Sequence, residues 1–308
     1  MTVWLMLIRA IHIGACLLFF GMFVFDRGIA SRLPNGQNEI GEYWKDRLRM
    51  ISWALPVVVL VSGMAWFALV AMTMSGQPFQ AGIMKIVWAQ TQFGVVSKIR
   101  LIFLVAATVL CCFQRSAPDV RNFAAWVQTL AAGCLLGSLA WAGHGLEGSR
   151  WHLLADVVHL LAAGVWPAGL LPLLLLLRRA RRIAGPRDWP GMSVVVSRFS
   201  AISLVTVSVL ATTGTVNAIY LVGTFPHLVG QPYGRWLLAK IIVFSVALVI
   251  AAFNLLRLKP RLMMERLEPE KAAATVAQIQ RNVQYELVLG LGIVAVVAVL
   301  GILPPASQ

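Results

Sequence analysis

The chain has 308 residues, of which 59% are hydrophobic and only 12% are charged, and it carries a formal net charge of +14. Soluble domains contain roughly 45–50% apolar and about 25% charged residues, so this composition excludes a soluble globular protein. The basic residues lie between hydrophobic runs and form no basic stripe with interleaved aromatic residues, so we expect no nucleic-acid partner. The four cysteines lie in or beside apolar runs and predict no disulfide framework.

Eight apolar runs follow one another along the whole chain, and crossing a bilayer takes about 20 such residues. They cover roughly residues 3–25, 51–74, 99–113, 123–143, 152–177, 199–222, 237–256 and 285–303. The loops between them are too short to form a separate core. We therefore predict an all-α, polytopic membrane protein, an eight-helix transmembrane bundle that forms a single integral membrane domain over residues 1–308 and lies in a lipid bilayer.

The basic residues orient this bundle. Nineteen of the 26 Lys and Arg residues fall in the loops after the first, third, fifth and seventh runs, which leaves seven for the other side. Cytoplasmic loops carry the excess of Lys and Arg, and an even number of spans puts both ends of the chain on one side. We therefore expect both termini on the periplasmic face of a bacterial inner membrane.

A faint internal repeat is visible. His12 precedes Gly21 much as His159 precedes Gly169. In addition, Phe93-Gly94 followed by Lys98-Ile99 is similar to Tyr233-Gly234 followed by Lys240-Ile241, although the glycine-to-lysine spacing differs by two residues. These matches suggest a parallel four-plus-four repeat of the kind found in transporters. Chance similarity between apolar helices is the alternative.

All five histidines fall on the outer side in this orientation. Two of them lie about two turns into the bilayer and three lie at helix ends or in a loop: His12 and His159, then His144, His152 and His227. Ionisable groups at membrane depth are costly and indicate function.

Three of these polar groups share one helix face. His152, Asp156 and His159 stand at positions i, i+4 and i+7, so an α-helix presents them on one side over two turns. Imidazole binds Cu, Zn, Fe and Ni, and a carboxylate either joins the ligands or orients a neighbouring histidine. In a purely structural role, Asp156 instead fixes a histidine tautomer or pairs with Arg9.

Sulfur groups occur near the same level. Met74 ends the second apolar run and Cys16 lies one turn below His12 on the same helix face. Thioethers combined with imidazoles favour Cu(I) over hard cations such as Ca²⁺ or Mg²⁺. Methionine is also common packing material in apolar cores, which is the alternative role for Met74.

The sequence offers no enzymatic machinery. It contains no Walker loop, nucleophile elbow, dinucleotide fingerprint or Cys-x-x-Cys pair. We therefore expect no enzyme, and any transport would be driven by a gradient or a partner.

A longer pattern connects these segments. It reads Gly143-His144, then His152-Leu-Leu-Ala-Asp156-Val-Val-His159-Leu-Leu-Ala-Ala-Gly-Val-Trp166, and ends in Gly169-Leu-Leu-Pro172. Further along the chain come Arg198-Phe199-Ser200, Thr213-Gly214 with Asn217, Tyr233-Gly234 before Lys240, and Asn254 with Pro260. With Arg9 and His12, this pattern resembles the CopD family of copper-resistance membrane proteins over most of residues 1–305. It departs from the family at Trp166-Pro167-Ala168-Gly169, where an apolar residue and two glycines usually follow the tryptophan.

The resemblance implies an inner-membrane protein of copper homeostasis that moves copper ions from the periplasm to the cytoplasm and receives them from a small periplasmic carrier of the CopC type. It implies copper, as Cu(I) or Cu(II), at His12, His144, His152, His159 and His227. Asp156 and Met74 join this candidate set from their spacing and depth. One alternative is a haem-binding membrane oxidoreductase with His12 and His159 as axial ligands. Another is a copper-binding sensor that conducts nothing.

Overall fold

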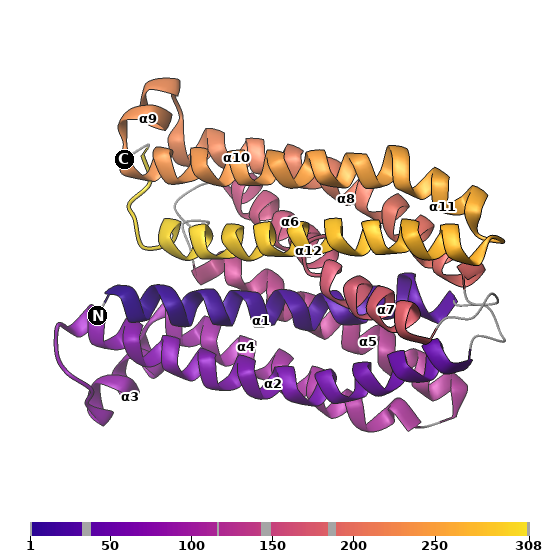
Figure 1. Cartoon of the computed structure of the whole chain (residues 1–308). Coiled ribbons are helices and arrows are strands. Elements are labelled where there is room, and N and C mark those ends of the chain that lie inside the picture. Colours follow the sequence, from indigo (N-terminus) through magenta and orange to yellow (C-terminus); the bar gives the residue numbers. More distant parts are fainter. Residues whose placement is uncertain (1, 33–37, 116, 143–148, 184–188, 307–308) are drawn as a thin grey trace.

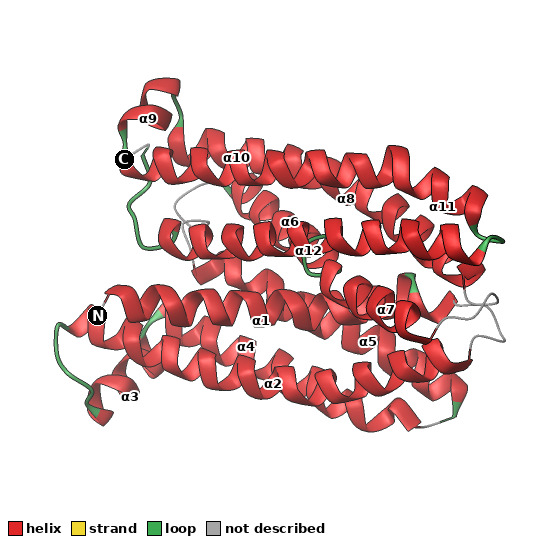
Figure 2. Cartoon of the chain, in the orientation of Figure 1, coloured by secondary structure: helices red, strands yellow, loops and turns green. Residues whose placement is uncertain are grey.

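The computed structural model describes residues 2–32, 38–115, 117–142, 149–183 and 189–306. Within these ranges the chain consists of helices and connecting loops, and no strand is found (Figure 2). The long helices are α1 (Thr2–Gly28), α2 (Asn38–Ser75), α4 (Gln92–Val109), α5 (Pro118–Gly137), α6 (Arg150–Val165), α7 (Leu170–Ile183), α8 (Trp189–Val222), α10 (Pro232–Phe253) and α12 (Pro269–Leu300). The short elements are η1 (Ala30–Arg32), α3 (Ala81–Gln90), η2 (Leu110–Arg115), η3 (Ser138–Ala142), α9 (Phe225–Gly230), the π-helical turn η5 (Asn254–Leu258) and α11 (Lys259–Glu265).

Eight segments of the described chain are long and apolar enough to cross a membrane, which confirms the predicted number. They are Thr2–Gly28, Glu39–Ser75, Gln92–Phe113, Asp119–Ala142, Arg150–Arg182, Trp189–Val222, Pro232–Glu265 and Pro269–Leu300. Large apolar side chains cover the outside of the bundle, as at Val205 and Val249, which are 67% and 71% exposed. Such a surface suits hydrocarbon rather than water.

The helices form one elongated bundle in which both described ends of the chain lie at the same end (Figure 1). Helices α1, α2, α4 and α5 make up the lower part in that view, and α8, α10 and α12 the upper part. Helix α1 packs against α2 and α5 and also against α6 and α12, so it joins the two parts. The short helices α3 and α9 project at the end that holds the termini, on opposite sides of the bundle (Figure 1).

Several helices are longer than the predicted apolar runs. Helix α2 begins at Asn38, well before the run at 51–74, and α12 begins at Pro269 rather than near residue 285. The added turns are polar and carry ion pairs within the helix, such as Lys45 with Glu42 at 2.8 Å. Hydropathy marks where the hydrocarbon ends, whereas backbone hydrogen bonding continues the helix into the aqueous layer.

Pro167, with Gly164 and Gly169 beside it, predicts a bend in the fifth span, and the structure has a complete break there. Helix α6 ends at Val165 and α7 begins at Leu170, because Pro167 has no N–H to donate to the preceding turn. Helix α1 packs tightly against this break. A methyl group at Gly21 would lie 2.5 Å from the carbonyl oxygen of Gly164 and 2.9 Å from Cβ of Ala168.

Candidate functional site

The predicted stripe on α6 lines one cavity. His152, Asp156 and His159 face an internal space of about 200 Å³ between α1, α6, α8, α10 and α12, which we call the outer cavity. Lys240 of α10 and Arg9 of α1 line the same space. The outer cavity therefore combines two imidazoles and a carboxylate with two basic groups at membrane depth, where ionisable side chains are rare.

His159 is held in one tautomer by a hydroxyl group on α8. Its Nδ1 lies 2.9 Å from Oγ1 of Thr213, and that hydroxyl donates its own hydrogen to the carbonyl of Val209 at 2.7 Å. The Thr213 oxygen therefore accepts from Nδ1–H. This leaves Nε2 with a lone pair, and no hydrogen bond to Nε2 is found among the described residues. Gly214 makes room for the ring, since a Cβ there would lie 3.4 Å from Cε1 of His159.

The other groups of the outer cavity have distinct partners. The Asp156 carboxylate accepts a hydrogen bond from Asn217 Nδ2 at 3.2 Å and lies close enough to Lys240 to interact with its charge. Arg9 donates to the carbonyl of Gly301 at 2.6 Å. His152 is only 2% exposed and stacks on Tyr220 with 5.0 Å between ring centroids. Its Nδ1 is buried without a hydrogen-bond partner, so a ligand or water would satisfy it.

His12 lies in a separate environment. It lines another cavity, of about 420 Å³, that the α6 stripe does not reach. Its Nδ1 lies 2.9 Å from Ser62 Oγ, and Ser62 donates to Val58 O at 2.6 Å. Its Nε2 accepts a hydrogen bond from Arg100 Nη2 at 2.6 Å, with the Cys16 sulfur 3.6 Å away. The guanidinium thus occupies the lone pair that a metal ion would use.

The two histidine sites have the same plan. Each histidine bonds through Nδ1 to a hydroxyl residue that is followed by a glycine, at Ser62-Gly63 in one half and Thr213-Gly214 in the other. In each half a basic residue follows a tightly packed glycine by six positions: Arg100 follows Gly94 in α4, and Lys240 follows Gly234 in α10.

The structure draws attention to another basic residue than the sequence comparison did. Arg100 contacts His12, and it follows Gly94 by the same six positions that separate Lys240 from Gly234. The Lys98 ammonium instead lies over the ring of Trp88, 5.7 Å from its centroid. The sequence alone could not choose between the two basic residues, because the choice depends on which one reaches the histidine of another helix.

The remaining candidate ligands lie elsewhere. Met74 is at the C-terminal end of α2 and is 61% exposed. His227 is in α9, where its Nδ1 lies 3.2 Å from the carbonyl of Val222. His144 lies outside the described residues. Among the residues that the structure describes, no group of three or more His, Cys, Asp or Glu side chains is arranged to hold one metal ion.

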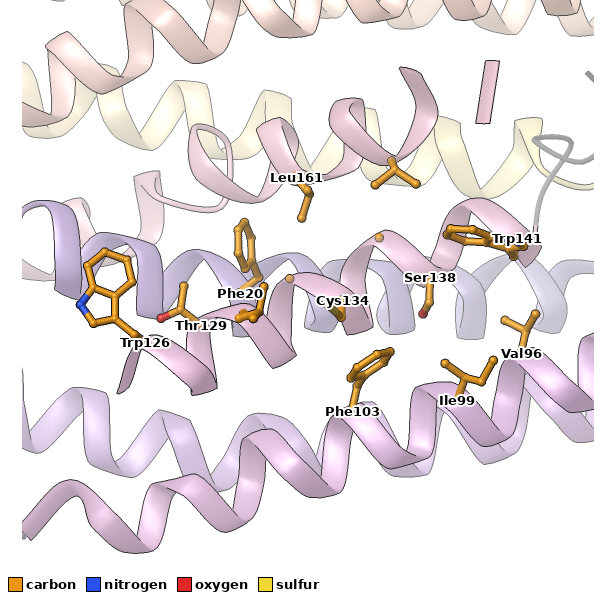
Figure 3. A pocket seen from close by; sticks show the side chains of 14 residues that line it. Phe20, Val96, Ile99, Phe103, Trp126, Thr129, Cys134, Ser138, Trp141 and Leu161 are labelled. Atoms are coloured by element: carbon orange, nitrogen blue, oxygen red, sulfur yellow. The ribbon is translucent and has the colours of Figure 1, made fainter. Parts of the chain in front are cut away.

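A larger cavity, of about 640 Å³, lies between α4 and α5 (Figure 3). Its wall is formed by Phe103, Trp126, Trp141 and other apolar side chains, and among the described residues of this wall the sulfur of Cys134 is the one soft metal ligand. The chemistry of this wall suits an acyl chain rather than an ion. We therefore place the candidate site in the outer cavity.

Comparisons with known proteins identify the family. Residues 193–300 match the family described as "Copper resistance protein D", and residues 1–153 match the family described as "Copper resistance protein D-like, N-terminal domain". The chain is 30% identical to "Copper resistance protein D" of Pseudomonas syringae pv. tomato, over 71% of each chain.

Two further relatives agree. The "Inner membrane protein YebZ" of Escherichia coli K12 is 24% identical over 98% of each chain. The "Copper transport protein CutJ" of Bacillus subtilis is 29% identical over 59% of this chain but only 34% of its own length. No solved structure matches. The histidine-bearing membrane bundle and these relatives together show that the chain is a multi-pass membrane protein of the copper resistance protein D (CopD) family.

Proposed function

We propose that this protein carries copper ions, its substrate, across the bacterial inner membrane from the periplasm to the cytoplasm, and that the outer cavity receives them. The observation that carries this proposal is the α6 stripe, which puts His152, Asp156 and His159 in one buried cavity. The names of two relatives, which refer to copper resistance and copper transport, support the choice of metal.

The stripe is spaced for successive rather than simultaneous binding. His159 follows His152 by seven residues, a rise of about 10.5 Å along the helix, and no group of three or more such ligands among the described residues is arranged around one ion, so we assign the ion to one imidazole at a time. An ion would pass from His152 past Asp156 to the Nε2 lone pair of His159. Conduction requires binding that is strong enough to admit the ion and weak enough to release it, which a series of sparse sites provides.

Lys240 keeps the binding weak. Its ammonium group and a copper ion compete for the same Asp156 carboxylate, and opposite charges attract strongly in a buried, low-dielectric space. The positive charge of Lys240 therefore opposes tight binding of a second cation at Asp156 and favours its departure.

The proposed delivery of copper from the periplasm rests on the orientation of the bundle in the membrane. The distribution of Lys and Arg favours periplasmic termini, which places α3, α9 and the outer cavity on the periplasmic half. We propose that a periplasmic carrier of the CopC type delivers copper there. Met74, His144 and His227 would be outer contacts for the arriving ion, and His12 and Cys16 a second ligand pair that opens only when Arg100 moves.

The haem alternative has less support. Both ring nitrogens of His12 have hydrogen-bond partners, Ser62 and Arg100, so neither is free to bind iron. His12 and His159 also line different cavities. The structure therefore favours sites for single ions over a haem held between these two histidines.

Cellular copper tests the proposal. We expect a His159→Ala strain grown in copper to accumulate no more metal than a strain that lacks the protein, because the exposed Nε2 ligand is gone. Cys134→Ala is the control, since this potential metal ligand lies in the separate apolar cavity lined by α4 and α5, and it should retain the accumulation. Wild-type accumulation by His159→Ala at equal protein levels would contradict the role of the stripe.

A further inference from the structure

A second polar cavity lies deeper in the C-terminal half. It measures about 270 Å³ and is lined by the α6/α7 break, α7, α8, α10, η5 and α12. Its wall is mostly apolar, and the polar exceptions are Ser200, Ser203, Asn254 and Glu286. We call it the inner cavity.

Glu286 is the one charged residue of this wall among the described residues, and it is only 3% exposed. Its Oε1 accepts a hydrogen bond from Asn254 Nδ2 at 2.7 Å, and Asn254 Oδ1 in turn accepts one from Asn282 Nδ2, also at 2.7 Å. A buried carboxyl group at membrane depth is costly and is found mainly in ion pathways and proton relays.

The orientation of the two amides selects the ligand. Asn254 points its N–H group at Glu286 Oε1, and its own amide oxygen is occupied by the N–H group of Asn282, so neither amide offers the carboxyl group a free metal-ligating oxygen. Among the described residues that line the inner cavity there is also no thioether or imidazole to bind copper. A proton needs only one free oxygen lone pair, so a proton fits this site and copper does not.

The inner cavity also has room and partners for water. Oγ of Ser203 is buried without a hydrogen-bond partner, although it lies in the wall of this space. A buried polar group of this kind is normally satisfied by water, and about 30 Å³ suffices for each molecule. Water in the inner cavity would give the Glu286 carboxyl a route for proton exchange.

The inner cavity follows the outer cavity along the same helices. Lys240 and Asn254 are 14 residues apart on α10–η5, a distance of about 21 Å along the axis. On α12, Gly290 lines the outer cavity one turn beyond Glu286. Pro167 lines the outer cavity and Trp166 the inner one, so the α6/α7 break separates the two.

The N-terminal half provides a contrast. Helix α5 packs on α4 as α12 packs on α10, and its buried polar residue is Gln128. The Gln128 amide donates to the carbonyl of Ala107 at 2.9 Å and to the sulfur of Cys111 at 2.9 Å. An amide cannot take up a proton, so Gln128 cannot do in the N-terminal half what the Glu286 carboxyl group can do in the other.

We propose that Glu286 binds and releases one proton in each transport cycle, so that copper movement through the C-terminal half is linked to proton movement. This inference rests on the proposed copper transport. A copper ion in the outer cavity favours the Glu286 carboxylate and release of its proton, and departure of the ion favours uptake of a proton. Apart from Glu286, the charged residues on the helices around the inner cavity do not line it in the described structure; they are Arg178, Arg179, Arg181, Arg182, Arg198, Arg235, Lys240, Arg257, Lys271, Arg281, Glu270 and, in the outer turns of α6, Arg150 and Asp156.

Proteoliposomes with an imposed pH gradient test this link, with copper alone as the transported ion. If one proton moves with each ion, a gradient of about one pH unit changes the steady-state copper ratio of the wild type by about tenfold, and the direction of the change gives symport or exchange. In Glu286→Gln, which places there the amide that Gln128 provides in the other half, copper still moves but the pH gradient has no effect.

The outcomes are distinguishable. The proton site is refuted if the steady-state copper ratio of the wild type does not change with the pH gradient. It is also refuted if the ratio of Glu286→Gln does change. No copper uptake by the wild type overturns the proposed function itself. If Glu286→Gln does not fold, infrared difference spectra of the wild type on copper addition decide instead: loss of a protonated carboxyl band, shifted in Asn282→Leu, supports the site, and an unchanged carboxyl region refutes it.

Discussion

A hydroxyl group on a neighbouring helix sets the tautomer of both His12 and His159. Thr213 and Ser62 each donate to their own helix backbone and therefore accept from imidazole Nδ1–H. Second partners of this kind fix the ring and direct the other nitrogen toward a metal. The two sites differ in what meets Nε2, which is the Arg100 guanidinium at His12 and the outer cavity at His159.

Thr213→Val tests this orientation, and its neighbour provides the control. Loss of the hydrogen bond to His159 should cost about 0.5–1.5 kcal/mol and slow copper uptake about two- to tenfold. Thr212→Val removes only a bond to Ser208 O of its own helix, on an exposed face, and should leave uptake unchanged. Initial uptake rates at equal protein levels give the comparison, and equal rates for the two variants would refute the positioning role of Thr213.

The sequence predicts part of this residue-scale picture. Helical spacing alone brings His152, Asp156 and His159 to one face, and the structure puts them in one cavity. The roles of Thr213 and Arg100 depend on contacts between helices 54 and 88 residues apart in the chain, which no local pattern reveals. For the same reason, the sequence groups His12 with His152, Asp156 and His159 as candidate ligands, whereas in the structure His12 lines a different cavity.

At the scale of elements, the α6/α7 break organises the C-terminal half. It separates the outer from the inner cavity, and α1 packs against it through Gly21. The sequence predicts a bend from Pro167, because a proline lacks the N–H that continues a helix. The hydropathy pattern did not predict the short helices α3 and α9, which lie between the apolar runs, or the polar extensions of α2 and α12. Hydropathy reports burial in lipid rather than backbone conformation.

Two glycines of α1 test the packing at this break. Gly21→Ala should lower the stability by about 1–3 kcal/mol, because the new methyl group would collide with the backbone at Gly164 and with Ala168. Gly14→Ala is the matched control on the same helix, since its nearest neighbour would be Cγ1 of Val294 at 4.0 Å, and it should be neutral or stabilising. Thermal unfolding in detergent compares the two, and equal midpoints would contradict tight packing at the break.

At the scale of the whole molecule, two similar halves carry similar sites in different states. Each half has a histidine, a hydroxyl residue with a glycine, and a basic residue six positions after a second glycine. This correspondence supports the parallel four-plus-four repeat that the sequence suggests. In the N-terminal half the basic residue closes the histidine, whereas in the C-terminal half it faces a carboxylate across a cavity. In the proposed transport, an ion would therefore bind first in the C-terminal half, and the His12 site would bind one only after Arg100 moves.

Copper flux into proteoliposomes that contain only this protein tests the account most directly, because it separates a transporter from a sensor that binds the same ion. The account predicts that copper accumulates inside vesicles with the wild type, and that His159→Ala reduces the uptake to that of empty vesicles. Copper bound by the wild type without accumulation inside, or equal accumulation by His159→Ala, would contradict it.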